Sequence, residues 1–154
     1  MAASLASLVQ MNQPTPQQVA DAMHARDHAA RSLDIKIVAV NLGSATVSML
    51  VRQDMVNGHD ICHGGYMALL CDTAFAYACN SFNLNTVASG FSIEILASAK
   101  LGDTLVAVGI EQAQRGRQGV YDIKLGNQNN EVIALFRGKS ARIAGEVIPT
   151  TQPT

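Results

Sequence analysis

The longest apolar segment of the chain, residues 64–80, predicts a single helix. Between Tyr66 and Cys79 its polar exceptions are Asp72 and Thr73. A helix that is apolar on every side packs in the middle of a domain rather than on its surface. The helical neighbours of Asp72 are apolar, so no cation of the same helix pairs with it. Such a carboxylate is either bonded to a neighbouring chain segment or serves as a catalytic base with a raised pKa.

A shorter helix is predicted before this segment. Residues 15–18, TPQQ, are typical of a capping box with proline at the first helical position. We expect an amphipathic helix to follow, from residue 16 to residue 30. The residues before it, 1–14, are small and polar and predict a loose tail.

Beyond residue 34 the period of the pattern falls to two, which indicates a strand. Alternation places Ile35, Ile37 and Ala39 on one face of that strand. A turn at 42–44 then leads into a second strand over 45–51, so the two strands form a hairpin.

Four further strands are predicted after the apolar helix, over 86–97, 103–114, 118–125 and 131–143. Their regular spacing and short turns favour an antiparallel sheet. One long apolar helix beside such a sheet is an α+β arrangement in which the sheet wraps around the helix. We expect one domain over 15–146 and a polar C-terminal tail over 147–154.

Composition and charge exclude several classes of protein. The 154 residues carry a net charge of −1 and no basic run, which argues against a nucleic-acid partner. The start, MAASLASLVQM, lacks the cationic region of a signal peptide, and no stretch is long enough to span a membrane. Three cysteines, two of them in the apolar helix, suit a reducing compartment, so we expect a cytoplasmic protein.

Two segments around the apolar helix resemble a known family. Residues 57–65, NGHDICHGG, and 72–81, DTAFAYACNS, are similar to the hotdog-fold acyl-CoA thioesterases of the phenylacetic acid degradation (PaaI) type. The segment 119–143 resembles the last strands of that family, and the similarity spans roughly residues 25–145. The resemblance implies hydrolysis of an acyl-CoA, most of all an aryl-acetyl-CoA, without a separate cofactor. It also implies a homo-oligomer, a dimer with shared active sites arranged as a dimer of dimers.

Four residues are candidates for the reaction site. Gly64 begins the predicted helix, where free amides and the positive end of the helix dipole meet, so it either polarises a carbonyl or simply permits a sharp turn. In the resembled family the first glycine of this motif polarises the thioester carbonyl, and an acidic residue at the position of Asp72 activates water or attacks directly. We favour the water, because the short aspartate side chain leaves room for it. Asn57 is a turn residue by pattern and His63 a helix cap, but the resemblance gives both a place at the reaction site.

Other polar residues carry weaker hypotheses. The cations Arg115, Arg117, Arg137, Lys139 and Arg142 are candidates for the phosphates of coenzyme A and equally suit a solvated surface. His59, Cys62 and His63 lack the spacing of a zinc site, so no metal is expected.

The sequence departs from the family at three places, Asp60, the segment 97–100 and Ala76, which leaves the acyl group open. A medium- or long-chain fatty acyl-CoA thioesterase and a non-catalytic acyl-CoA-binding protein are the alternatives. A hotdog dehydratase would require a histidine–proline context that is absent.

Overall fold

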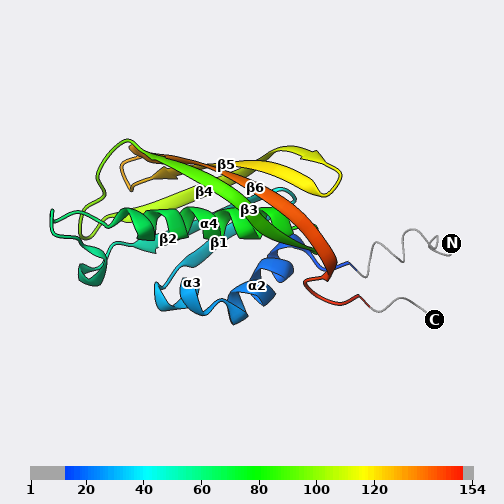
Figure 1. Cartoon of the computed structure of the whole chain (residues 1–154). Helices are drawn as coiled ribbons and strands as arrows, with labels where there is room; N and C mark the ends of the chain where they lie inside the picture. The colour runs from blue at the N-terminus through cyan, green and yellow to red at the C-terminus, as the bar shows by residue number, and fades with distance from the viewer. Residues whose placement is uncertain (1–12, 151–154) are drawn as a thin grey trace.

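The computed structural model describes residues 13–150, which form one curved antiparallel sheet around one long helix (Figure 1). The six strands lie in the order β1-β2-β4-β5-β6-β3. Their bounds are Lys36–Asn41 (β1), Ser44–Leu50 (β2), Leu84–Ile95 (β3), Thr104–Arg115 (β4), Gln118–Gly126 (β5) and Val132–Glu146 (β6). The predicted α+β arrangement and hotdog fold are therefore confirmed, and the strand limits differ from the expected ones by at most three residues.

The long helix α4 spans Gly64–Asn80, as the apolar pattern predicted. It lies across one face of the sheet and contacts β2, β3, β4 and β5. Phe75 is the centre of this contact, since its ring packs against Tyr121 and Phe136 at centroid distances of 5.5 and 6.2 Å. The ring also covers Gly138 of β6, where a Cβ would be too close to it.

The predicted helix over 16–30 is two helices, α2 (Pro16–Arg26) and α3 (His28–Ser32). The capping box at Thr15 is confirmed, with Gln18 donating to and accepting from it. The single-helix prediction was wrong because Asp27 leaves the helical conformation, with φ −85° and ψ 86°. Its side chain then accepts a hydrogen bond from the amide of Ala30 at 2.9 Å and caps the second helix.

The alternation predicted for the first strand also needs a correction. The register of β1 against β2 shifts between Ile37 and Ala39, so Val38 is an extra, bulged residue. Beyond the bulge the faces exchange: Val40 is buried, with 8% of its surface exposed, and Ala39 faces solvent. A bulge is invisible to a strict period of two, because it changes the period only where pairing occurs.

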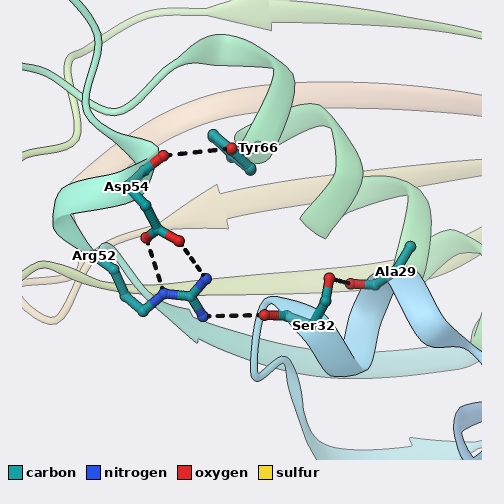
Figure 2. A network of polar contacts seen from close by, with 5 residues as sticks. All are labelled: Ala29, Ser32, Arg52, Asp54 and Tyr66. Carbon is teal, nitrogen blue, oxygen red and sulfur yellow. Dashed lines mark hydrogen bonds and ion pairs between the residues drawn. The ribbon is translucent and has the colours of Figure 1, made fainter.

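A polar network joins the end of α3 to the first turn of α4 (Figure 2). Arg52 follows β2 and precedes a short 3₁₀ turn, Gln53–Met55. Its guanidinium donates two hydrogen bonds to the Asp54 carboxylate, at 3.0 and 2.9 Å, and one to the Ser32 carbonyl at 3.3 Å. The Tyr66 hydroxyl donates to the Asp54 carbonyl at 3.4 Å.

The ends of the described chain are tied to the domain or lie outside it. Ile148 exchanges two hydrogen bonds with the Asn83 side chain, each 2.9 Å, so this part of the expected C-terminal tail contacts the domain. Residues 1–12 and 151–154 of the expected tails lie outside the described part. Within residues 13–150, no helix has the length and apolarity required to cross a bilayer.

The contact between Phe75 and Gly138 generates a stability prediction. A Cβ added at residue 138 would lie 2.9 Å from three ring atoms of Phe75. We expect Gly138→Ala to lower the free energy of unfolding by about 1–3 kcal/mol through overpacking. Urea unfolding at one fixed protein concentration measures this. Gly58→Ala, which adds a Cβ with no atom within 4 Å, is the control, and equal stability of both variants would contradict the prediction.

Candidate active site

The first turn of α4 leaves one backbone amide without a partner. His63 is the N-cap, and its Nδ1 accepts a hydrogen bond from the amide of Gly65 at 3.0 Å. Its carbonyl accepts from the amide of Tyr66, also at 3.0 Å. Among the hydrogen bonds of residues 13–150, none uses the amide of Gly64. The cap therefore satisfies the neighbouring amides and leaves the Gly64 amide, at the positive end of the helix, as a free donor.

A hollow of about 260 Å³ opens beside this amide. It lies between the loop before α4, the first turn of α4 and the end of β3, and its wall has both polar and apolar surface. Its lining residues are Asn57, Ile61, Cys62, Gly64, Met67, Ile95, Leu96, Ala97 and Ser98. The Ile95 side chain lies directly over Gly64, 3.0 Å from the position that a Cβ would occupy there. Ile95 and the residues that follow it were not predicted as part of a site, because apolar residues at the end of a strand carry no local mark of one.

Asn57 lines the same hollow, and its side chain also shapes the loop. Its Oδ1 accepts hydrogen bonds from the amides of His59 and Ile61, at 2.9 and 3.4 Å. This agrees with the turn expected from the Asn-Gly pair. Among the described residues the Nδ2 group has no protein acceptor, so it remains a donor beside the hollow.

Asp72 lies outside this hollow, eight residues further along α4, which is about 12 Å at the helical rise. Its carboxylate is half-buried and has no ion pair within residues 13–150. Burial raises the pKa of Asp72, and the nearby negative charge of Asp27 raises it further. Within one chain, the free Gly64 amide and the Asp72 carboxylate with its raised pKa therefore lie apart.

The candidate phosphate-binding cations do not gather near Gly64 in one chain. Arg115 and Arg117 flank the β4–β5 turn, which pairs with β6 at Ala141, toward the other end of α4. Arg117 donates to the carbonyl of Arg142 at 3.0 Å. Arg137 forms a two-bond ion pair with Asp122, at 2.6 and 2.7 Å, in a larger hollow of about 530 Å³ on the sheet face away from α4.

Lys139 is exposed on β6, two residues beyond Arg137.

Potential metal ligands are also dispersed, since no group of three or more His, Cys, Asp or Glu side chains suited to a metal occurs in residues 13–150. In particular, the Cys62 side chain is buried whereas His59 and His63 are exposed.

Comparisons with known proteins identify the family of the chain. The thioesterase superfamily profile matches residues 59–134. The acyl-coenzyme A thioesterase PaaI of Escherichia coli is 48% identical over 130 residues, which cover 84% of this chain and 93% of the relative. The chain belongs to the thioesterase superfamily. The family predicted from the motifs at residues 57–81 is confirmed, and with it the class of enzyme, a thioester hydrolase.

Solved structures of other proteins share the same fold. The E. coli PaaI protein from the phenylacetic acid degradation operon has a TM-score of 0.84 and 47% identity, covering 85% of this chain and 95% of that one. A Streptococcus mutans protein bound to acetyl CoA has a TM-score of 0.69 and 28% identity, covering 73% and 90%.

The environment of Asp72 in this thioesterase predicts a pH-dependent stability effect. Because the pKa of Asp72 is raised on folding, its ionised form destabilises the folded protein at neutral pH. We expect Asp72→Asn to melt at a higher temperature than the wild type at pH 7. The difference should shrink as the pH falls toward about 3.9, the ordinary pKa of an aspartate, because both proteins are then neutral at this position. A lower melting temperature of the variant at pH 7 would mean that the carboxylate is stabilised by a partner.

Proposed function

We propose that the protein is an acyl-CoA thioesterase that hydrolyses aryl-acetyl-CoA, such as phenylacetyl-CoA or hydroxyphenylacetyl-CoA. The observation that carries the proposal is the free Gly64 amide at the start of the helix that also bears the half-buried Asp72. The aryl-acetyl group is supported by the relative from the phenylacetic acid degradation operon, and coenzyme A by the relative bound to acetyl CoA.

In the proposed reaction Asp72 takes a proton from a water molecule, whose oxygen then bonds to the thioester carbonyl carbon. The Gly64 amide donates to the carbonyl oxygen as negative charge develops on it. The carbon–sulfur bond breaks and the sulfur leaves as thiolate. Since a thiol has a pKa of about 8.5, this leaving group needs no acid, metal or cofactor.

His63 and Asn57 support this step in different ways. By accepting the Gly65 amide, His63 fixes the first turn of α4 and leaves the Gly64 amide free. The unused Nδ2 group of Asn57, beside the same hollow, positions the carbonyl or the water. Both are therefore assigned as positioning residues.

We further propose that Gly64 of one chain works with Asp72 of the partner subunit in a dimer. In one chain the two groups are about 12 Å apart along α4. A two-fold axis that sets two α4 helices side by side in opposite directions would bring Gly64 of one chain close to Asp72 of the other. The long edge strand β3 supports this dimer, because Val87, Phe91 and Ile95 on it are 46%, 52% and 49% exposed.

The same arrangement suggests where the rest of the substrate binds. It sets the β4–β5 turn of one chain toward the Gly64 end of its neighbour, which makes Arg115 and Arg117 the favoured candidates for CoA phosphates. A dimer of dimers and a cytoplasmic location complete the proposal; the three free cysteines suit that compartment.

The role of Asp72 is tested by kinetics. Asn has nearly the same shape as Asp but accepts no proton, so we expect Asp72→Asn to lower kcat by about 10²–10⁴ with little change in substrate binding. Thiol release from phenylacetyl-CoA, benzoyl-CoA and fatty acyl-CoA measures both the rate and the preference. A variant with wild-type kcat would remove Asp72 from the mechanism, a preference for fatty acyl-CoA would correct the acyl group, and absence of turnover with every thioester would favour the binding protein.

The shared site predicts complementation between two inactive variants. Gly64→Pro removes the free amide, and its backbone is tolerated because Pro suits the first helical position and His63 already has φ −62° and ψ 132°. Mixed and refolded with Asp72→Asn, it should form hybrid dimers with one complete site. With random pairing, half of the dimers are hybrids, and one of the two sites in each hybrid has both groups intact. About a quarter of wild-type activity should therefore return.

Gly64→Ala is the matched control, because it keeps the amide and adds only a Cβ against the mobile end of Ile95. It should retain most activity. Hybrids verified by mass that remain as inactive as both parents would show that the two groups do not meet across an interface.

A further inference from the structure

Asp27 is a half-buried carboxylate that the reaction as described above does not use. It ends α2 and begins α3, and the hydrogen bond from the Ala30 amide to its Oδ1, 2.9 Å long, fixes its position. The two helices lie along α4 on the side away from the sheet (Figure 1). A carboxylate at this corner therefore faces the part of the molecule that contains Asp72, and its level along α4 can be located from two attachments.

The first attachment is near the C-terminal end of α4. The Nδ1 of His24, on α2, lies 2.9 Å from the hydroxyl of Tyr77, and the two rings meet edge to face at 6.2 Å. The second attachment is at the other end of α4, where the network in Figure 2 joins the Ser32 carbonyl, through Arg52 and Asp54, to the Tyr66 hydroxyl. The α2–α3 segment thus runs antiparallel to α4.

Asp27 lies between these attachments, about a third of the way from His24 to Ser32. The same fraction of the path from Tyr77 back to Tyr66 reaches the level of Asp72 and its neighbour Thr73. The chain therefore holds two carboxylates at the same level, one on the corner and one on α4. Neither forms an ion pair within residues 13–150.

The ionisable groups around the two carboxylates agree with this placement. Burial is the main cause of the raised pKa of Asp72, and the charge of Asp27 is the next. The pKa of the Tyr77 phenol is raised by the same two causes, again with burial first. On α4 itself, burial raises the pKa of the Cys71 and Cys79 thiols to about 12, with the charge of Asp72 adding to it. On the covering helices His24 contacts Tyr77, while His28 and Arg31 are exposed to solvent.

We propose that Asp27 is a second carboxylate of the reaction site, held at the level of Asp72 by the α2–α3 corner, and that its negative charge assists the transfer of a proton to Asp72. The proposal rests on the proposed role of Asp72. When Asp72 takes the proton of the attacking water, the repulsion between the two carboxylates disappears. That relief is greater in the transition state than in the ground state, and it therefore accelerates the step. Asp27 touches no reacting atom, so it is a positioning residue.

The test removes the charge and keeps the cap. In Asp27→Asn the side-chain oxygen still accepts the Ala30 amide, because Asn caps helices as well as Asp does. The acidic limb of the kcat/KM profile reports the ionisation of Asp72 in the free enzyme. Without the neighbouring negative charge Asp72 ionises at lower pH, so we expect the acidic limb of the variant to shift to lower pH. At neutral pH kcat should fall, since the base is weaker.

Two variants separate this effect from a loss of structure. Asp21→Asn removes the same charge from an exposed position of α2 and should leave the acidic limb of the kcat/KM profile in place. Asp27→Ser, which keeps a capping oxygen without a charge, repeats the test if the Asn variant folds poorly.

Two outcomes are decisive and distinct. In the first outcome, Asp72→Asn is inactive, but the acidic limb of the kcat/KM profile of the folded, uncharged Asp27 variant coincides with that of the wild type. The role of Asp27 is then overturned and that of Asp72 stands. If Asp72→Asn keeps the wild-type kcat, the proposed function fails first, and any shift in the limb belongs to another group.

Discussion

The packing of α4 against one face of the sheet is the contact on which the rest of the structure depends. The helix has so few polar side chains that only burial against β2–β5 and the covering helices accounts for its stability. Phe75 and Gly138 fix its distance from the sheet, because the ring lies on a position with no Cβ. The free amide, the perturbed carboxylate and the attachment of α2 to Tyr77 are all consequences of where this one helix lies.

Two polar features of α4, at its start and near its middle, are unfavourable for stability. At the start, His63 satisfies the amides of Gly65 and Tyr66, which concentrates the unsatisfied donor capacity on Gly64. Near the middle, Asp72 is half-buried, and its pKa is raised by burial and further by the negative charge of Asp27. Stability alone would favour neither feature, since a free amide and an unpaired carboxylate both raise the free energy of the folded state. Their presence on one helix is understandable as an adaptation to thioester chemistry.

The surface of the single chain also has features that a second copy of the chain would explain. The edge strand β3 and the half-exposed side of α4 leave apolar surface uncovered, and Gly64 and Asp72, the proposed reaction groups, lie apart in one chain. A second copy of the chain would resolve both at once. The N-terminal helices have the opposite role, because they cover α4 within the chain and carry Asp27 to it.

The sequence alone determined the elements with a strong local pattern. The apolar run gave α4 to the residue, the capping box gave the start of α2, and the motifs around Gly64 and Asp72 gave the family. It did not determine the break at Asp27 or the bulge at Val38. Both depend on which groups meet after folding, a carboxylate with the Ala30 amide in one case and a register against β2 in the other.

Only the tertiary structure decided which amide of the first turn is free, that Ile95 lies over Gly64, and that Arg137 is engaged by Asp122. The physical reason is the same throughout. Periodicity and capping are interactions between residues a few positions apart, and sequence order preserves them. Hydrogen-bond partners, charges and contacts from distant segments are set by the packing of α4 between sheet and helices, which no local pattern records.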